Sequence, residues 1–258
     1  MEQKRNAVEL WWLGQMGLMI GSGNTRLCID YYATPDENRQ TQPPIPAEEL
    51  HGINIFIGTH DHLDHIDHGA WKIWARNNPS AKFVFPRKHM DSVLADGVNK
   101  DNAIGINAGE SVCIGDVTIH AIAASHEFLD QDPETGLYPY LQYLVEINGV
   151  RIHHAGDTLR YEGMMPELKS FGNIDVQLLP INGRDAKRYS ENCIGNMTYQ
   201  EAADLAGEVE PAMVIPGHWD MFKDNSADPT EFADYLKVKY HDSIKCKIPE
   251  VMEKIIIS

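Results

Sequence analysis

The six residues 60–65 contain three histidines and two aspartates, in the order His-Asp-His-Leu-Asp-His. Imidazole nitrogens and carboxylate oxygens together suit divalent Zn, Mn or Fe. In an extended segment His60 and His62 can point the same way, and Asp64 and His65 can then face a second metal ion. Polar groups beside a buried strand are unfavourable unless a metal ion or water satisfies them. The motif therefore predicts a metal centre rather than a solvated turn.

Three further residues of metal-ligand type follow apolar, strand-like runs, namely His126, Asp157 and His218. The runs are residues 117–123, 150–153 and 213–215, and the apolar run 53–57 likewise precedes His60. In layered α/β folds, residues at strand ends and in the loops beyond them converge on one site. We therefore expect all of these side chains to meet.

The order H-x-H-x-D-H, followed by His126, Asp157 and His218, resembles the signature of the metallo-β-lactamase superfamily over nearly the whole chain. The resemblance implies an α/β fold, a four-layer αββα sandwich, with the site at one edge. It further implies two metal ions, bridged by Asp157, with Asp64 and Asp157 as the catalytic carboxylates. The implied ligands are His60, His62 and His126 for one ion and Asp64, His65 and His218 for the other.

Within the superfamily, the sequence is most similar to the L-ascorbate-6-phosphate lactonase group. The likeness rests on Trp-Trp-Leu-Gly-Gln-Met-Gly at 11–17, on Cys-Ile-Asp at 28–30 and on residues 59–67. It implies a hydrolase in which metal-activated hydroxide opens a small lactone or ester, such as a phosphorylated sugar-acid lactone. The chain departs from that group at Ser125-His126-Glu127, where the group has no histidine, and this favours a more general two-metal site.

Other residues are candidates for supporting roles. Asp61 would orient a ligand histidine or handle protons, and Glu127 would accept a hydrogen bond behind His126. Arg184 and Arg188 belong to a basic segment in an acidic chain, where a guanidinium could bind a substrate phosphate or carboxylate. A solvated loop or a subunit contact explains that segment equally well. Residues 128–140 are either a lid over the site or a plain surface loop.

Composition limits the function further. The 258 residues, 43% of them hydrophobic, predict a single domain spanning 1–258. The net charge of −16 argues against long nucleic acids, whereas a small anionic substrate stays possible because metal ions reverse the local field. No apolar run is long enough to cross a membrane, and the N-terminus does not resemble a signal peptide, so we expect a cytoplasmic protein. The four cysteines are expected to be buried free thiols.

Two other functions compete with the hydrolase of small lactones or esters. A phosphodiesterase or nuclease uses the same fold, although the acidic charge disfavours polymers and leaves small diesters open. A diiron redox protein or a non-catalytic metal-binding protein is the other alternative, and the full set of ligand types disfavours it. The lactonase resemblance also hints at a homo-oligomer.

The elements that must position these residues follow from local patterns. Residues 8–13, 17–20 and 27–32 predict an antiparallel meander, and residues 33–46 a surface loop. Strands are expected at 53–57, 82–85 and 175–180, and helices at 71–76 and 88–94. Asn148-Gly149 predicts a type I′ hairpin between residues 143–147 and 150–153. Thr198 and Asp228 begin the two remaining helices.

Overall fold

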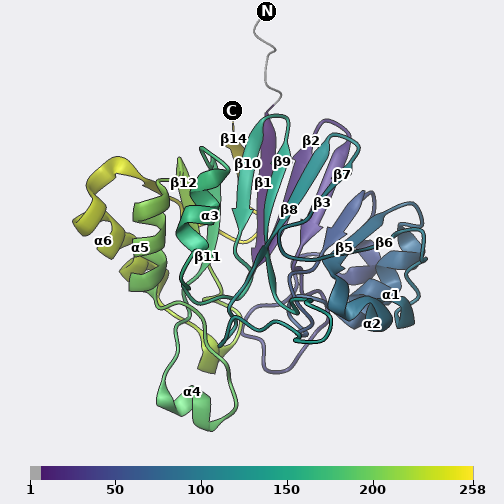
Figure 1. The fold of residues 1–258 in the computed structure, drawn as a ribbon, viewed down its shortest axis with the longest axis horizontal. Helices are drawn as coiled ribbons and strands as arrows, with labels where there is room; N and C mark the ends of the chain where they lie inside the picture. The colour runs from purple at the N-terminus through teal and green to yellow at the C-terminus, as the bar shows by residue number, and fades with distance from the viewer. Residues whose placement is uncertain (1–6, 258) are drawn as a thin grey trace, which may run out of the picture.

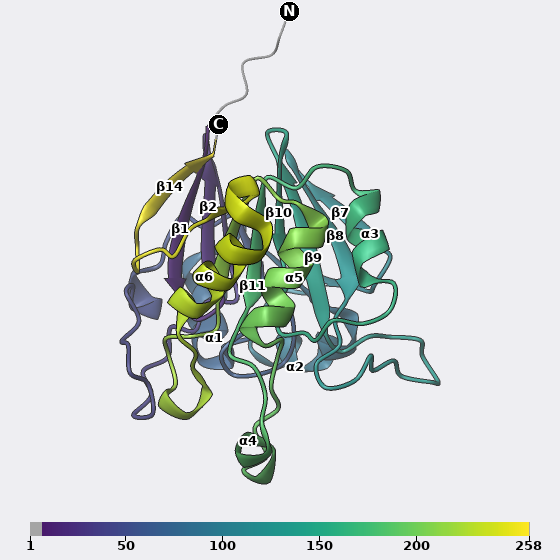
Figure 2. The ribbon, with the colours of Figure 1, turned by 90° about the vertical axis from the view of Figure 1, so that its left-hand side faces the viewer.

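The computed structural model describes residues 7–257. Two seven-stranded sheets face each other, in the orders β14-β1-β2-β3-β4-β5-β6 and β13-β12-β11-β10-β9-β8-β7. Helices cover the outer face of each sheet, as Figure 1 and Figure 2 show from two sides. The expected four-layer αββα sandwich is therefore confirmed.

The first sheet begins with the expected antiparallel meander of β1 (Val8–Gly14), β2 (Gly17–Ser22) and β3 (Thr25–Ile29). Three strands then add in parallel to β3: β4 (Ile55–Ile57), β5 (Lys82–Pro86) and β6 (Ala103–Ile106). The C-terminal strand β14 (Lys254–Ile257) pairs antiparallel with β1 and closes the other edge.

The second sheet contains an antiparallel set and a parallel set. The antiparallel set is β7 (Ser111–Ile114), β8 (Val117–Ala123), β9 (Leu141–Ile147) and β10 (Val150–His154). Parallel to β10 lie β11 (Val176–Pro180), β12 (Met213–Gly217) and β13 (Lys245–Cys246). The β9–β10 hairpin turns at Asn148 and Gly149, whose φ angles of 49° and 75° match the predicted type I′ turn.

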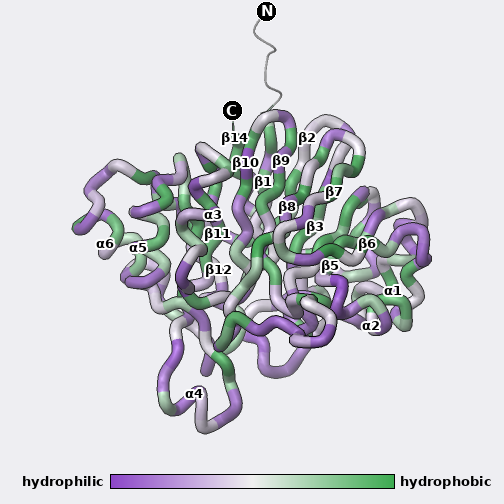
Figure 3. Tube along the Cα trace, viewed as in Figure 1, coloured by the Kyte–Doolittle hydropathy of each residue, from purple (hydrophilic) through white to green (hydrophobic). Residues whose placement is uncertain are grey.

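Three hydrophobic clusters hold the four layers together. The first lies between the two sheets and includes Leu18, Ile57 and Tyr143. The second packs α1 (His68–Asn77) and α2 (Met90–Ala95) on the first sheet, and the third packs α3 (Met164–Ser170), α5 (Tyr199–Val209) and α6 (Pro229–Tyr240) on the second. Figure 3 shows the hydrophobic stretches running along the strands of both sheets.

Local signals explain where the helices begin. Thr198 and Glu201 form the predicted capping box of α5, and Asp228 caps α6 ahead of Pro229. The short elements α3, α4 (Ala186–Ser190), β6, β7, β13 and β14 were not predicted, because brief segments carry little periodicity. Single 3₁₀ turns lie at Ala47–Glu49, Arg87–His89, Lys223–Asn225 and His241–Ser243.

The loops that follow β3, β4, β8, β10 and β12 open at one edge of the sandwich. Because β8 and β10 each run antiparallel to β9, they point the same way as the parallel strands β11 and β12. This edge faces down in Figure 1, where the loop carrying α4 projects.

Two smaller findings concern membrane spans and thiols. Within residues 7–257, no helix is both long and apolar enough to cross a membrane. All four cysteines are free, as expected, but only Cys28 is buried. Cys113 is exposed because it lies on β7, an edge strand of the second sheet. The expectation of buried thiols is therefore confirmed for Cys28 alone, since Cys193 and Cys246 are partly exposed and Cys113 is exposed.

Candidate metal centre

The predicted ligand residues come together at this edge. His60 to His65 follow β4, and His126, Asp157 and His218 follow β8, β10 and β12. Their donor atoms form three groups, each with all atoms within 4.8 Å of one another. The groups are His60, His62 and His126; His60, His65 and Asp157; and Asp64, His65 and His218.

Asp157 lies between the group of His60, His62 and His126 and the group of Asp64, His65 and His218, which we call the two outer groups. Its Oδ1 is 3.3 Å from His65 Nε2, and its Oδ2 is 3.2 Å from His218 Nε2 and 3.8 Å from His126 Nε2. Asp64 Oδ2 lies 3.6 Å from both His65 Nε2 and His218 Nε2. The Asp157 carboxylate thus faces donor atoms of both outer groups, whereas the Asp64 carboxylate belongs to only one of them.

Several of these donor atoms are buried without a hydrogen-bond partner among the described residues. They are His60 Nε2, His65 Nε2, His126 Nδ1 and Asp157 Oδ1. A buried polar atom left unsatisfied costs about 1–3 kcal/mol, and such clusters are rare in folded proteins. Bound divalent cations would satisfy such atoms, and mixed imidazole and carboxylate donors suit Zn, Mn or Fe. The cluster therefore fits a metal centre.

Electrostatics divide the histidines into two kinds. Burial and the neighbouring histidines hold the pKa of His60 well below its usual value, and burial lowers the pKa of His126 to about 4. Burial also opposes protonation of His65, but the carboxylates of Asp157, Asp64 and Asp30 outweigh it and raise the pKa of His65 well above its usual value. In the metal-free protein, protons are therefore held mainly by histidines beside the carboxylates, such as His65, and a metal ion that binds there must displace these protons.

The buried side chain of Asp30, which follows β3, supports two parts of the His-rich segment. Its oxygens accept hydrogen bonds from the Thr59 backbone N–H at 2.8 Å and the Thr59 hydroxyl at 2.6 Å. His65 Nδ1 lies 2.6 Å from Asp30 Oδ2, so Nδ1–H donates to the carboxylate and Nε2 faces the metal centre. This role of Asp30 was not predicted from the sequence, where Asp30 is only part of the family resemblance. An acidic residue directly after an apolar strand was the available signal.

The backbone is unusual around the cluster. Gln15, Asp30, Glu127 and His218 all have positive φ angles, between 46° and 72°. Residues held in such conformations persist only where the surrounding structure fixes them, and they concentrate at functional sites. Gly156 also has a positive φ, and a Cβ there would lie 2.8 Å from the Thr59 Cβ. Only glycine allows the Asp157 loop to approach the His-rich segment this closely.

Of the two expected supporting residues, Asp61 has contacts away from the predicted ligands. Asp61 Oδ1 lies 2.6 Å from His68 Nε2, and Asp61 Oδ2 accepts a hydrogen bond from the Ser92 hydroxyl at 3.0 Å. Asp61 thus contacts α1 and α2 residues rather than a ligand histidine. Glu127, directly after His126 in the chain, is partly exposed, and its support of His126 stays a prediction.

Both arginines of the basic segment are engaged within the protein. Arg184 donates to both carboxylate oxygens of Glu201, at 2.6 and 2.8 Å, and to the Asn196 carbonyl. Arg188 donates to the carbonyls of Asn182 and Ser226. The structure therefore brings neither guanidinium into the groups of donor atoms described above. Their binding of substrate stays a prediction.

The loop of residues 128–140 borders the centre at its C-terminal end. The ring of Tyr140 lies against those of His60, His62 and His126, with centroid distances of 5.4, 6.0 and 5.3 Å. Phe128, at the other end of this loop, is 67% exposed. The loop is therefore placed where a lid would have to be, and its movement stays a prediction.

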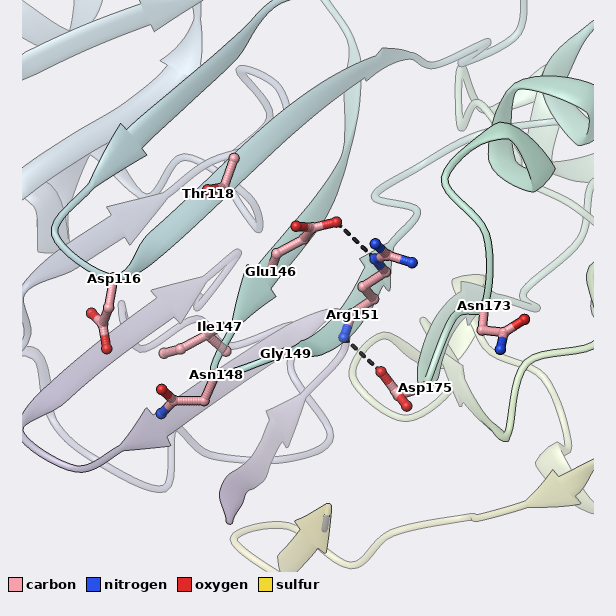
Figure 4. Close-up of a pocket in the computed structure, with 9 residues that line it drawn as sticks. All are labelled: Asp116, Thr118, Glu146, Ile147, Asn148, Gly149, Arg151, Asn173 and Asp175. Atoms are coloured by element: carbon pink, nitrogen blue, oxygen red, sulfur yellow. Dashed lines mark hydrogen bonds and ion pairs between the residues drawn. The ribbon is translucent and has the colours of Figure 1, made fainter. Parts of the chain in front are cut away.

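A separate cavity of about 420 Å³ lies at the opposite end of the second sheet, beside the Asn148-Gly149 turn (Figure 4). Its Arg151 is held by Glu146, with Nε 2.7 Å from Oε1, and by Asp175, which accepts the backbone N–H. Asp157 follows the other end of β10, so this cavity is distinct from the metal centre.

The sequence matches a known family over the part of the chain that builds this site. The model of the beta-lactamase superfamily domain matches residues 25–219. The chain belongs to this superfamily. The match includes every predicted ligand, from His60 to His218.

Relatives and solved structures agree with this assignment. The chain is 27% identical to a UPF0173 metal-dependent hydrolase of Pyrococcus furiosus, over 87% of this chain and 90% of that protein. It is 25% identical to the probable L-ascorbate-6-phosphate lactonase UlaG of Escherichia fergusonii, over 89% and 74% of the two chains. The structure of Igni18, a metallo hydrolase of Ignicoccus hospitalis, covers 98% of this chain with a TM-score of 0.77 and 22% identity. The last comparison supports the metallo-β-lactamase fold.

Proposed function

We propose that this superfamily member is a metal-dependent hydrolase with two divalent ions, Mn, Zn or Fe, that opens a small lactone or ester. The observation that carries the proposal is the set of buried donor atoms on His60, His65, His126 and Asp157 that make no hydrogen bond within the described chain. A solvated turn or a hydrogen-bonded polar cluster would not leave such atoms unsatisfied. Relatives that share most of the chain are named as a metal-dependent hydrolase and a probable lactonase.

The groups of donor atoms suggest how the chain would hold the ions. His60, His62 and His126 would bind one, Asp64, His65 and His218 the other, and Asp157 would contact both. Bound ions would supply hydroxide at neutral pH and polarise the substrate carbonyl. Asp30 would keep His65 in the tautomer that presents Nε2 to the ion.

Exposed apolar side chains beside the metal centre indicate what kind of substrate would bind there. Leu63, between two ligand residues in the chain, is 55% exposed, and Phe128, two residues after His126, is 67% exposed. Exposed apolar side chains beside the centre favour a substrate with an apolar portion. A phosphorylated sugar-acid lactone would need cationic partners, and Arg184 and Arg188 already use donors within the protein.

The test combines metal loading with a substrate panel. Protein loaded with Mn, Zn or Fe would be assayed on lactones with and without a phosphate group, on simple esters and on a generic phosphodiester. We expect lactone or ester opening that is abolished in His62→Ala. The matched control is His120→Ala, because His120 packs against Phe171 and lies outside the centre. Cleavage of the diester alone would overturn the proposal and place the protein among phosphodiesterases. Absence of all hydrolysis would overturn it as well.

A further inference from the structure

Gln15 lies in the turn between β1 and β2 and is completely buried, although it belongs to none of the groups of donor atoms. Its φ of 54° is uncommon for a residue other than glycine. Its backbone anchors the segment that carries His218. The Gln15 N–H donates to Asp220 Oδ1 at 2.8 Å, and the Gln15 carbonyl accepts the His218 N–H at 2.9 Å. The unusual backbone of Gln15 therefore connects this turn to a ligand loop far away in the sequence.

The side chain of Gln15 contacts two residues of one group of donor atoms. Its Nε2 donates to Asp64 Oδ2 at 2.9 Å. The same nitrogen lies 3.2 Å from Nδ1 and 3.1 Å from Nε2 of His218. An atom almost equally distant from both ring nitrogens lies over the face of an imidazole, because an in-plane position would clash with ring carbons. Gln15 therefore does not occupy the in-plane lone pair of His218, which a metal ion would use.

The oxygen that accepts this hydrogen bond is the one nearest the neighbouring histidines. Asp64 Oδ2 lies 3.6 Å from His65 Nε2 and 3.6 Å from His218 Nε2. A hydrogen bond on this oxygen fixes the direction in which Asp64 points. An amide achieves this without adding negative charge to a site that already contains Asp64, Asp157 and Asp220. A glutamate at position 15 would lack the donor and would repel Asp64.

Solvent cannot reach Gln15, so a substrate in the open part of the site cannot touch it. We propose that Gln15 is a positioning residue that holds Asp64 and His218 in place for one of the two metal ions. This inference rests on the proposed metal-dependent function. It implies that loss of the Gln15 amide weakens the ion at Asp64, His65 and His218 and spares the ion at His60, His62 and His126.

The experiment measures metal binding directly, as well as activity. Wild type and Gln15→Met, which keeps the size but removes the donor, would be loaded with Co(II) and titrated with a chelator. Visible spectra and metal analysis would follow each ion. We expect one ion of Gln15→Met to bind about 10–100-fold more weakly and the other to be unchanged. We also expect kcat to fall while KM stays the same, because Gln15 does not touch substrate.

Gln177 offers a matched control. It is also a fully buried glutamine, and it donates from Nε2 to His153 Nδ1 at 3.0 Å. The Oε1 atoms of Gln15 and Gln177 both lack a hydrogen-bond partner in the described chain. Gln177→Met should retain both ions at wild-type affinity. Gln15→Glu, which keeps the length but not the donor, should repeat the loss and serves if Gln15→Met does not fold.

The outcomes separate this inference from the proposed function. Two tightly bound ions in both Gln15 variants would overturn the positioning role and leave the hydrolase proposal intact. Equal weakening of both ions, or the same loss in Gln177→Met, would show a general effect on folding and would also overturn it. A wild-type protein that binds no ion would overturn the proposed function itself.

Discussion

The Nδ1 atom of His65 lies 2.6 Å from Oδ2 of Asp30, and neither side chain is exposed to solvent. A fully buried carboxylate thus holds a fully buried imidazole at the centre of the cluster. The same oxygen accepts the Thr59 hydroxyl, so one carboxylate fixes both ends of the segment between Thr59 and His65. This contact sets the ring orientation before any metal ion arrives.

We expect Asp30→Asn to lower metal affinity about 10–100-fold, because the amide no longer fixes the His65 tautomer or favours a positive neighbour. Competition with a chromophoric chelator measures the change. Asp67→Asn is the control, since Asp67 is also buried but accepts hydrogen bonds from Ala33 and Thr34 rather than from a ligand residue. Equal affinity in Asp30→Asn and wild type would contradict a role for Asp30 in holding the metal ligand.

Arg184→Gln distinguishes a structural role from a substrate-binding role. The bidentate pair with Glu201 is partly exposed, so solvent limits its contribution to about 1 kcal/mol. We expect Tm to fall by about 2–4 °C, with KM for anionic substrates unchanged. Calorimetry and steady-state kinetics provide the two readouts. A tenfold rise in KM at unchanged Tm would instead assign Arg184 to substrate binding.

His153 should make stability depend on pH. Its Nε2–H donates to Gln142 Oε1 at 3.1 Å while Nδ1 accepts from Gln177, so the folded state needs the neutral ring. Burial, with a smaller contribution from His154, lowers the pKa of His153 to about 3, against about 6.5 in an unfolded chain. Between these values only the unfolded state binds the proton. Stability from this group is therefore present above pH 6.5 and is lost as pH falls, by up to about 1.4 kcal/mol per pH unit.

Urea unfolding of metal-free protein at pH 7, 6 and 5 tests this expectation. The free energy of unfolding of His153→Gln should decline less steeply with falling pH than that of wild type, because one such proton-binding group is removed. Other buried histidines, including His126, contribute equally to both proteins. Parallel slopes for the two proteins would show that His153 is already protonated in the fold.

The metal centre was visible in the sequence for a physical reason. Metal ions accept few donor types, and the predicted ligands lie in the loops that follow apolar strands whose directions the layered fold fixes. The αββα layers were predictable from the family resemblance together with the meander and the Asn148-Gly149 hairpin. These features depend on local composition and spacing, which a sequence displays.

The partners of single polar residues could not be read in this way. Gln15 and Asp30 are isolated polar residues in apolar segments, and only the folded chain brings them to Asp64 and His65. The charge of Arg184 was evident, but its pairing with Glu201 depends on how the loop around α4 meets α5. Long-range hydrogen bonds of this kind have no periodic signature.

A last prediction concerns the contact between α5 and α6, where packing should reverse an ordinary helix rule. Alanine normally stabilises a helix interior by about 1 kcal/mol relative to glycine. At Gly207, however, a Cβ would lie 2.1 Å from Cζ of Tyr240. We therefore expect Gly207→Ala to destabilise the protein by about 1–3 kcal/mol, the usual range for overpacking. Chemical denaturation measures the effect. In a Tyr240→Ala background the clash is absent, so Gly207→Ala should become stabilising. A stabilising effect of Gly207→Ala in the wild-type background would contradict the prediction and show that α5 and α6 separate readily.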